Sequence, residues 1–193
     1  MRKIPTIFER DWDGNRSLVV DTPHPDCDWV FRGEGVATRK YDGMCCKVSD
    51  GELWKRREIK NGSTAPDGFV VSSVDTVTGK TTGWVKVSDG DPDNRYFLDA
   101  FADSTNGGSA SLPDGTYELL GPRVQGNPEG FDKHILLAHA SAETFGDCPR
   151  TFAGLRDWLA GKDIEGVVFH HPDGRMAKIK GRDFGLKRKH LAA

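Results

Sequence analysis

Residues 35–48 read GVATRKYDGMCCKV, and this stretch decides the fold prediction. Two strand-like runs, 35–41 and 44–48, flank Asp42-Gly43, a dipeptide typical of tight turns between antiparallel strands. Lys40 lies at the end of the first run, just before the turn. The segment therefore predicts a strand, a tight turn and a second strand, with a lysine held beside the turn.

Other short apolar runs extend this pattern along the chain. Further strands are predicted at 53–59, 115–121, 135–139, 166–170 and 176–180. Helical spacing is clearest at 151–161, where Thr151 can serve as N-cap and Gly161 can end the helix, and it is weaker at 93–102. The sequence thus predicts an α+β fold, with mainly antiparallel sheets and flanking helices.

Length and composition narrow the class of protein. The chain has 193 residues, of which 36% are hydrophobic, and this is enough to fill a core and argues against a disordered chain. No run approaches the roughly 20 apolar residues of a membrane-spanning helix, and no secretory signal follows Met1. The four cysteines form no C-x-x-C pair, which argues against a zinc site or disulfide framework. We expect a soluble, cytoplasmic protein with reduced thiols. We also expect one domain over residues 1–193, in which residues 1–34 form an N-terminal lead-in segment.

Charge is distributed unevenly. Lys and Arg number 27 and Asp and Glu 29, so the net charge is -2. Between Arg175 and Lys189, however, seven basic residues face one acid, a local charge of +6 against -8 elsewhere. The basic end is where we expect a polyanion to bind.

Two lysines near this end favour an anion site. Lys178 and Lys180 are two residues apart on one predicted strand, so they share a face, with Ala177 and Ile179 on the other. Two adjacent ammonium groups repel unless an anion lies between them. A solvated strand face is the alternative interpretation, and K-x-D-G by itself is common in surface hairpins.

Two acids lie within predicted buried strands. Glu118 is flanked by Tyr117 and Leu119, and Glu165 precedes Gly166-Val167-Val168-Phe169. A buried carboxylate needs a cation or a metal as partner, whereas an edge-strand Glu can point to solvent. The co-occurrence of both acids with Lys40 and the paired lysines favours a functional site.

Taken in order, these segments resemble the motifs of a known superfamily, that of DNA ligases, RNA ligases and mRNA capping enzymes. Lys40-Tyr41-Asp42-Gly43, Arg56-Arg57, Tyr117-Glu118-Leu119-Leu120-Gly121, Glu165-Gly166-Val167-Val168 and Lys178-Ile179-Lys180 are similar to nucleotidyltransferase motifs I, Ia, III, IV and V. The segment 37–46 resembles the K-x-D-G-x-C-C signature of a small ATP-dependent 5′–3′ RNA ligase family. The resemblance implies a nucleotidyltransferase (adenylyltransferase) fold.

The resemblance also implies a three-step reaction. Lys40 would attack the α-phosphorus of ATP and form lysyl-AMP, AMP would pass to an RNA 5′-phosphate, and a 3′-hydroxyl would then seal the strand. Lys178 and Lys180 would neutralise the α-phosphate and disfavour the charged form of Lys40, since a free lysine with a pKa of about 10.4 is a poor nucleophile at neutral pH. Glu165 would bind Mg²⁺, or Mn²⁺ in its place, and Glu118 would hold the ribose or a second metal position.

Other assignments stay open at this point. Either Arg56 or Arg57 would be the motif Ia arginine that binds ATP, and Arg57 is our named candidate. His139 is a candidate for packing on the adenine, with a core histidine as the alternative. His170 and His171 are assigned no chemistry, and the tryptophans are expected in the core.

The resemblance ends at Lys180, after which thirteen residues follow. These are too few for the OB domain that DNA ligases and capping enzymes carry, so none is expected. The basic tail 181–193 would contact RNA phosphates through Arg182, Lys187, Arg188 and Lys189. The expected partner is RNA with 5′-phosphate and 3′-hydroxyl ends. A minimal DNA ligase, a capping guanylyltransferase and a catalytically silent nucleotide- or RNA-binding module are the alternatives.

Overall fold

The structure is a computed structural model that describes residues 3–76 and 78–188. The chain divides into two compact units. Unit 1 comprises Met1–Lys3 and Asp42–Ser141, and unit 2 comprises Ile4–Tyr41 and Ala142–Ala193. One domain over residues 1–193 stays a prediction. Within the described ranges, no helix has the length and apolar character needed to cross a membrane.

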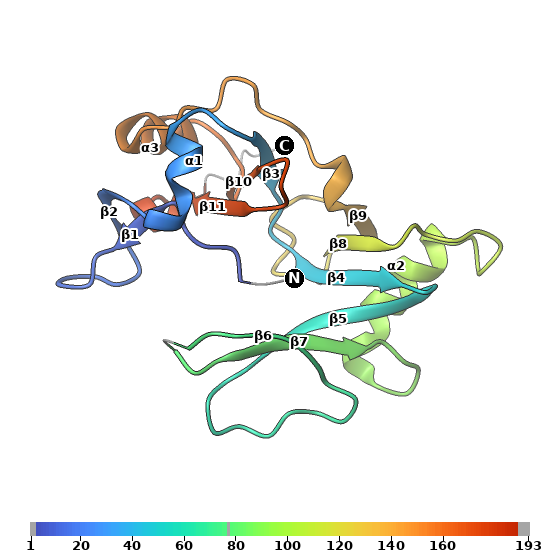
Figure 1. The fold of residues 1–193 in the computed structure, drawn as a ribbon. Coiled ribbons are helices and arrows are strands. Elements are labelled where there is room, and N and C mark those ends of the chain that lie inside the picture. The colour runs from blue at the N-terminus through green and yellow to red at the C-terminus, as the bar shows by residue number, and fades with distance from the viewer. Residues whose placement is uncertain (1–2, 77, 189–193) are drawn as a thin grey trace. The chain divides into compact units, whose positions relative to one another are not determined.

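Unit 1 is built on a six-stranded antiparallel sheet with the order β6-β7-β5-β4-β8-β9 (Figure 1). Its strands are β4 (Met44–Ser49), β5 (Glu52–Ile59), β6 (Val70–Val74), β7 (Thr81–Lys86), β8 (Gly115–Leu120) and β9 (Ile135–Ala138). Helix α2 (Arg95–Ser104) follows the 3-10 turn η2 (Pro92–Asn94), and η3 (His139–Ser141) follows β9.

The two faces of this sheet differ in chemistry because side chains alternate along each strand. One face carries Cys46, Val48 and Leu53, which form a buried core with Phe97 and Ala100 of α2. Directly paired residues point to the same side of a sheet, so the register assigns the other face. That face carries Cys45, Lys47, Trp54, Arg56, Trp84 and Glu118.

Unit 2 contains a three-stranded antiparallel sheet with the order β11-β10-β3 and a two-stranded ribbon, β1-β2. The strands are β1 (Phe8–Arg10), β2 (Val19–Pro23), β3 (Val36–Lys40), β10 (Gly166–His170) and β11 (Met176–Lys180). The helices are α1 (Asp28–Phe31) and α3 (Phe152–Ala160), with 3-10 turns η1 (Pro25–Cys27) and η4 (Gly181–Phe184). Thr151 caps α3 as expected, since its hydroxyl accepts a hydrogen bond from the Gly154 N–H at 3.2 Å.

The core of unit 2 lies against one face of the three-stranded sheet. Ala37, Val167, Phe169, Ala177 and Ile179 are buried there, with exposures of 2% or less. By alternation, Thr38, Lys40, Lys178 and Lys180 occupy the opposite face.

The predicted fold class is wrong. Instead of an α+β nucleotidyltransferase fold with flanking helices, the described chain is mostly antiparallel sheet, with α-helices of 4, 10 and 9 residues. Both predicted helices are present, but the prediction missed four strands, β1, β2, β6 and β7, which shift the balance towards sheet. The cysteines are free, and three of the four are buried, as expected.

Candidate active site

Lys40 lies opposite a glycine in the three-stranded sheet of unit 2. It ends β3 and pairs with Gly166 of β10, which pairs on its other side with Lys180 of β11. Paired residues point to one side of a sheet, so both lysines rise from the same face, one on each side of Gly166.

Gly166 is required by the close approach of the neighbouring strand. A Cβ at this position would lie 2.1 Å from the carbonyl oxygen of Ile179 and 2.7 Å from the Cα of Lys180. Real Cβ atoms essentially never come this close to backbone, so only glycine allows β10 and β11 to pair here. The space between the two lysines is therefore left without a side chain.

Glu165 joins the two lysines. Its Oε2 lies 2.6 Å from the Nζ of Lys40, and its Oε1 accepts a hydrogen bond from the Nζ of Lys180. The side chains of Lys40, Glu165 and Lys180 are 20%, 9% and 12% exposed, so the ion pairs are largely removed from water. The carboxylate thus satisfies two cations that would otherwise repel each other.

The charges of this cluster shift its pKa values. Burial acts to raise the pKa of Glu165, but the charges of Lys40 and Lys180 outweigh it, so the net pKa is lowered and the group is ionised at neutral pH. Burial, followed by the charge of Lys40, lowers the pKa of Lys180. These carboxylate and ammonium groups are coupled through direct contact.

Lys178 is the remaining cation of the cluster. Within residues 3–76 and 78–188, no hydrogen-bond or ion-pair partner is found for its Nζ. Burial, with the charges of Lys180 and Lys40, lowers the pKa of Lys178 to about 8. Its backbone is fixed on both sides, since its N–H donates to the Pro5 carbonyl at 2.9 Å and its carbonyl accepts from the Ile7 N–H at 3.0 Å. A half-buried ammonium without a partner, on a fixed strand, suits an incoming anion.

Glu118 occupies a separate polar cluster in unit 1. It is 6% exposed. Its Oε1 accepts from the Gly43 N–H at 3.2 Å, and its Oε2 lies 2.9 Å from the Nε2 of His139. The other ring nitrogen of His139 lies 2.9 Å from the Thr116 hydroxyl. His139 therefore orients Glu118.

The register distinguishes the two adjacent arginines of β5. Glu118 pairs with Cys45, and Lys47, two residues further along β4, pairs with Trp54. Arg56 lies two residues beyond Trp54, so alternation places it on the same face as Glu118. Arg57 lies on the opposite face and is exposed. Of the two candidates, Arg56 is the one that shares a sheet face with Glu118.

The predicted site residues thus fall into two groups. The structure brings together Lys40, Glu165, Lys178 and Lys180 within unit 2, whereas Glu118 and Arg57 belong to unit 1. In the basic tail, Arg182 and Lys187 are exposed, but Arg188 is held by Asp163 at 2.8 Å. Lys189 lies outside the described residues.

The residues present do not fit a resident metal ion. In the part of the chain that the structure describes, no group of three or more His, Cys, Asp or Glu could hold a metal. Both oxygens of Glu165 already contact ammonium groups, and both oxygens of Glu118 are hydrogen-bonded. We therefore place no metal on either carboxylate and derive no step through one.

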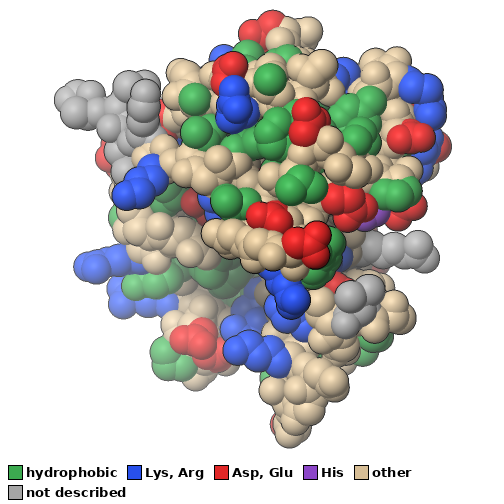
Figure 2. Space-filling model, turned by 90° about the vertical axis from the view of Figure 1, so that its left-hand side faces the viewer, with side chains coloured by type: hydrophobic (Ala, Val, Ile, Leu, Met, Phe, Trp, Pro, Cys, Tyr) green, Lys and Arg blue, Asp and Glu red, His purple; other side chains and the backbone are tan. Residues whose placement is uncertain are grey.

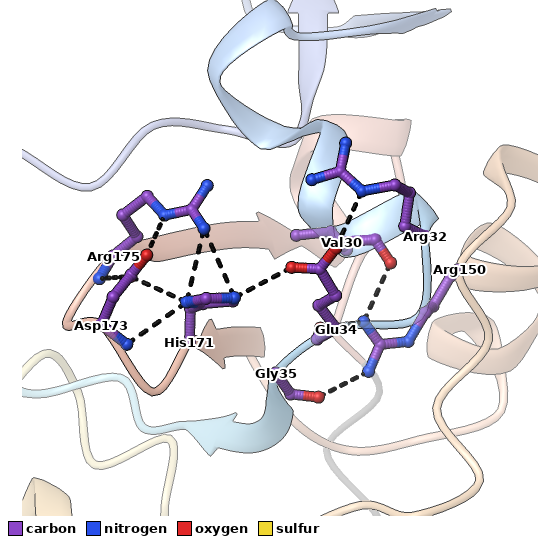
Figure 3. A network of polar contacts seen from close by, with 8 residues as sticks. All are labelled: Val30, Arg32, Glu34, Gly35, Arg150, His171, Asp173 and Arg175. Atoms are coloured by element: carbon purple, nitrogen blue, oxygen red, sulfur yellow. Dashed lines mark hydrogen bonds and ion pairs between the residues drawn. The ribbon is translucent and has the colours of Figure 1, made fainter.

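A polar network around His171 was not predicted from the sequence (Figure 3). The ring nitrogens of His171 lie 2.9 Å from Glu34 and 2.8 Å from Asp173, and the Nε of Arg175 donates to Asp173 at 2.8 Å. Nearby, Arg150 donates to the carbonyls of Val30, Glu34 and Gly35. No local sequence signal could reveal this network because its contacts join distant residues, such as Glu34 and His171, which are 137 residues apart. It anchors the segment before β3 and gives no reason to assign chemistry to His171.

Comparison with known proteins gives one point of reference. Over 87 residues, the chain is 32% identical to a protein named RNA ligase 1 from Danio rerio. The match covers 40% of this chain and 26% of that relative, so the chain spans about a quarter of the relative's length. No protein-family model matches the chain. The chain therefore has a distant relative among RNA ligases.

Proposed function

We propose that this protein is an ATP-dependent RNA ligase that joins 5′-phosphate and 3′-hydroxyl RNA ends through a lysyl-AMP intermediate. One observation carries the proposal: Lys40 and Lys180 share Glu165 in a largely buried cluster, with the unpartnered ammonium of Lys178 on the same sheet face. A cluster of three lysines and one carboxylate carries excess positive charge, and a nucleotide phosphate would supply negative charge. The similarity to RNA ligase 1 supports this choice among anion-binding functions.

In the first step, the lone pair of the Lys40 Nζ forms a bond to the α-phosphorus of ATP. The bond from that phosphorus to the bridging oxygen breaks, and pyrophosphate leaves with the electron pair. The Lys40 ammonium gives one proton to solvent before the attack, and the nitrogen gives a second proton to solvent or to the leaving pyrophosphate as the phosphoramidate forms. Lys178 and Lys180 would balance the charge on the phosphate as it develops. Mg²⁺ bound to ATP would offset part of the triphosphate charge.

The second step takes place at the same phosphorus, and the third at the phosphorus of the RNA 5′-phosphate. An oxygen of the RNA 5′-phosphate displaces Lys40 from AMP and gives a 5′-adenylated RNA, which releases the lysine for another cycle. The 3′-hydroxyl oxygen of the second end then attacks the 5′-phosphate, and AMP leaves. Ligation therefore consumes one ATP and regenerates the amine.

The direct test is labelling of the chain with α-³²P-ATP or α-³²P-GTP, followed by denaturing electrophoresis. A ligase gives acid-labile label from ATP, and a capping-type enzyme gives label from GTP. No label with either nucleotide would contradict the proposal and favour a silent binding module. Sealing of 5′-phosphorylated RNA compared with nicked DNA then separates an RNA ligase from a minimal DNA ligase.

The pH dependence of ATP binding should identify Lys178. Because the pKa of Lys178 is about 8, the free protein loses this positive charge as the pH rises through that value. At pH 9 the ammonium fraction is about one tenth, so the part of the ATP affinity that needs this charge should fall by up to about tenfold between pH 7.5 and 9. Equilibrium binding of a fluorescent ATP analogue measures it.

The matched variant is Lys178→Arg, because arginine keeps its charge over this range. It should flatten the decline, while Lys178→Ala should bind weakly at every pH. Identical pH profiles for the wild type and Lys178→Arg would show that Lys178 is not a phosphate ligand.

A further inference from the structure

A second group of cations lies on the open face of the unit 1 sheet. The Nζ of Lys47, from β4, lies 5.1 Å from the ring centroid of Trp54 on β5 and 5.4 Å from that of Trp84 on β7. Because β5 lies between β4 and β7, the ammonium reaches across the middle strand and contacts two indoles. Such cation–π contacts stabilise the ammonium but leave its hydrogen-bond donors unused.

Arg56 brings a second positive charge to the same place. It follows Trp54 by two residues on β5 and pairs directly with Trp84, so its side chain shares their face. Its Nε is buried and has no hydrogen-bond partner in the described chain, and the same holds for the Nε1 of Trp54. Every unsatisfied polar atom of this cluster is thus a donor.

The acids on this face are already paired. Glu52 binds Lys86, Glu58 binds Lys80 at 2.7 Å, and Glu118 contacts His139. Among the described residues, neither Lys47 nor Arg56 has an ion-pair partner. Half-buried cations without counter-charges favour an anion from outside the chain.

Only one kind of ligand uses all of these groups. An inorganic anion would use the cations and leave the indole of Trp54 without a role, whereas a nucleotide offers both a phosphate and a flat base. Trp84 is 4% exposed and can only position Lys47, but Trp54 is partly accessible. The flexible stem of Lys47 can move aside and open both buried donors to the ligand.

We infer that Lys47, Trp54 and Arg56 form a nucleotide subsite for the RNA strand, with a backbone phosphate at the two cations and a base on Trp54. This rests on the proposed function, which requires an RNA-binding surface. The basic tail 181–193 offers fewer cations for RNA than the sequence predicted, because Arg188 forms an ion pair with Asp163. On the face that Figure 2 draws, Lys and Arg side chains are interspersed with Asp and Glu.

The test measures binding of a fluorescein-labelled, 5′-phosphorylated single-stranded RNA to the full chain by anisotropy, without ATP, over a range of salt. Lys47→Ala and Trp54→Ala should each weaken binding by about tenfold, and Lys47→Ala should reduce the slope of log K against log salt by about 0.7. Lys60→Ala, which removes an exposed lysine of unit 1, is the matched control and should leave both values unchanged.

Lys47→Arg and Trp54→Phe distinguish loss of a contact from loss of the fold. Lys47→Arg keeps the charge and Trp54→Phe keeps an aromatic ring, so both should retain most of the RNA affinity. Unchanged RNA binding in Lys47→Ala would overturn the inference. Loss of AMP labelling in Lys47→Ala with RNA binding intact would also overturn it, because the subsite would then belong to ATP. A wild type that takes no AMP label but loses RNA affinity in Lys47→Ala would contradict the proposed ligase and leave the RNA subsite standing.

Discussion

Replacement of Lys40 by alanine should reduce AMP labelling of the chain to background. The proposed intermediate is a phosphoramidate on the Lys40 Nζ, and alanine offers no atom that can form it. Lys40→Arg should be equally inactive, because a guanidinium keeps the charge but not the nucleophile. The measurement is acid-labile ³²P on the denatured chain after incubation with α-³²P-ATP.

The control for this prediction is again Lys60→Ala, which should label like the wild type. Lys40→Ala should still bind ATP measurably, because Lys178 and Lys180 remain. Persistent acid-labile label in Lys40→Ala would assign the nucleophile to another residue. Peptide mapping of the labelled wild type would then identify that residue.

Gly166→Ala should disrupt the sheet that carries the site. The added Cβ would come within 2.1 Å of the Ile179 carbonyl oxygen, and the clashing atom is backbone, which cannot rotate away. We expect a loss of about 1–3 kcal/mol in the free energy of unfolding, seen as a lower melting temperature by circular dichroism. AMP labelling should fall too, because β11 must shift and carry Lys180 away from Glu165.

Gly146→Ala is the matched control, since its backbone is not left-handed and an added Cβ would meet no atom within 4 Å beyond its chain neighbours. It should melt and label like the wild type. If Gly166→Ala also behaved in this way, the close packing of β10 on β11 would be disproved.

Local alternation was sufficient to predict much of the candidate site. It placed Lys178 and Lys180 on one face and Ala177 and Ile179 on the other, and the structure confirms this arrangement and buries Ala177 and Ile179. The strands on both sides of Asp42-Gly43 are present as β3 and β4, but β3 belongs to the three-stranded sheet and β4 to the six-stranded sheet. The predicted tight turn between paired antiparallel strands is therefore wrong. The strand positions and faces depend on period-two patterns, which are encoded within a few residues.

Features that depend on strand pairing were not predictable in the same way. The contact of Lys40 with Glu165 joins residues 125 positions apart and exists only because β3 and β10 pair. The choice of Arg56 over Arg57 as the neighbour of Glu118 needed the register of β4, β5 and β8. Strands β6 and β7 were missed because β6 exposes its valines and β7 contains Gly83, so neither shows the expected alternation.

The pairing of Lys40 and Lys180 with Gly166 also fixes the distance between the backbones of the two lysines. Each lysine is one strand away from the glycine, so two inter-strand spacings of about 4.8 Å set the separation of their Cα atoms. This distance is fixed by backbone hydrogen bonds and does not depend on which side chains fill the core beneath. Substitutions at Val167 or Ile179 can therefore change the stability of unit 2 while the distance between the Cα atoms of Lys40 and Lys180 stays constant.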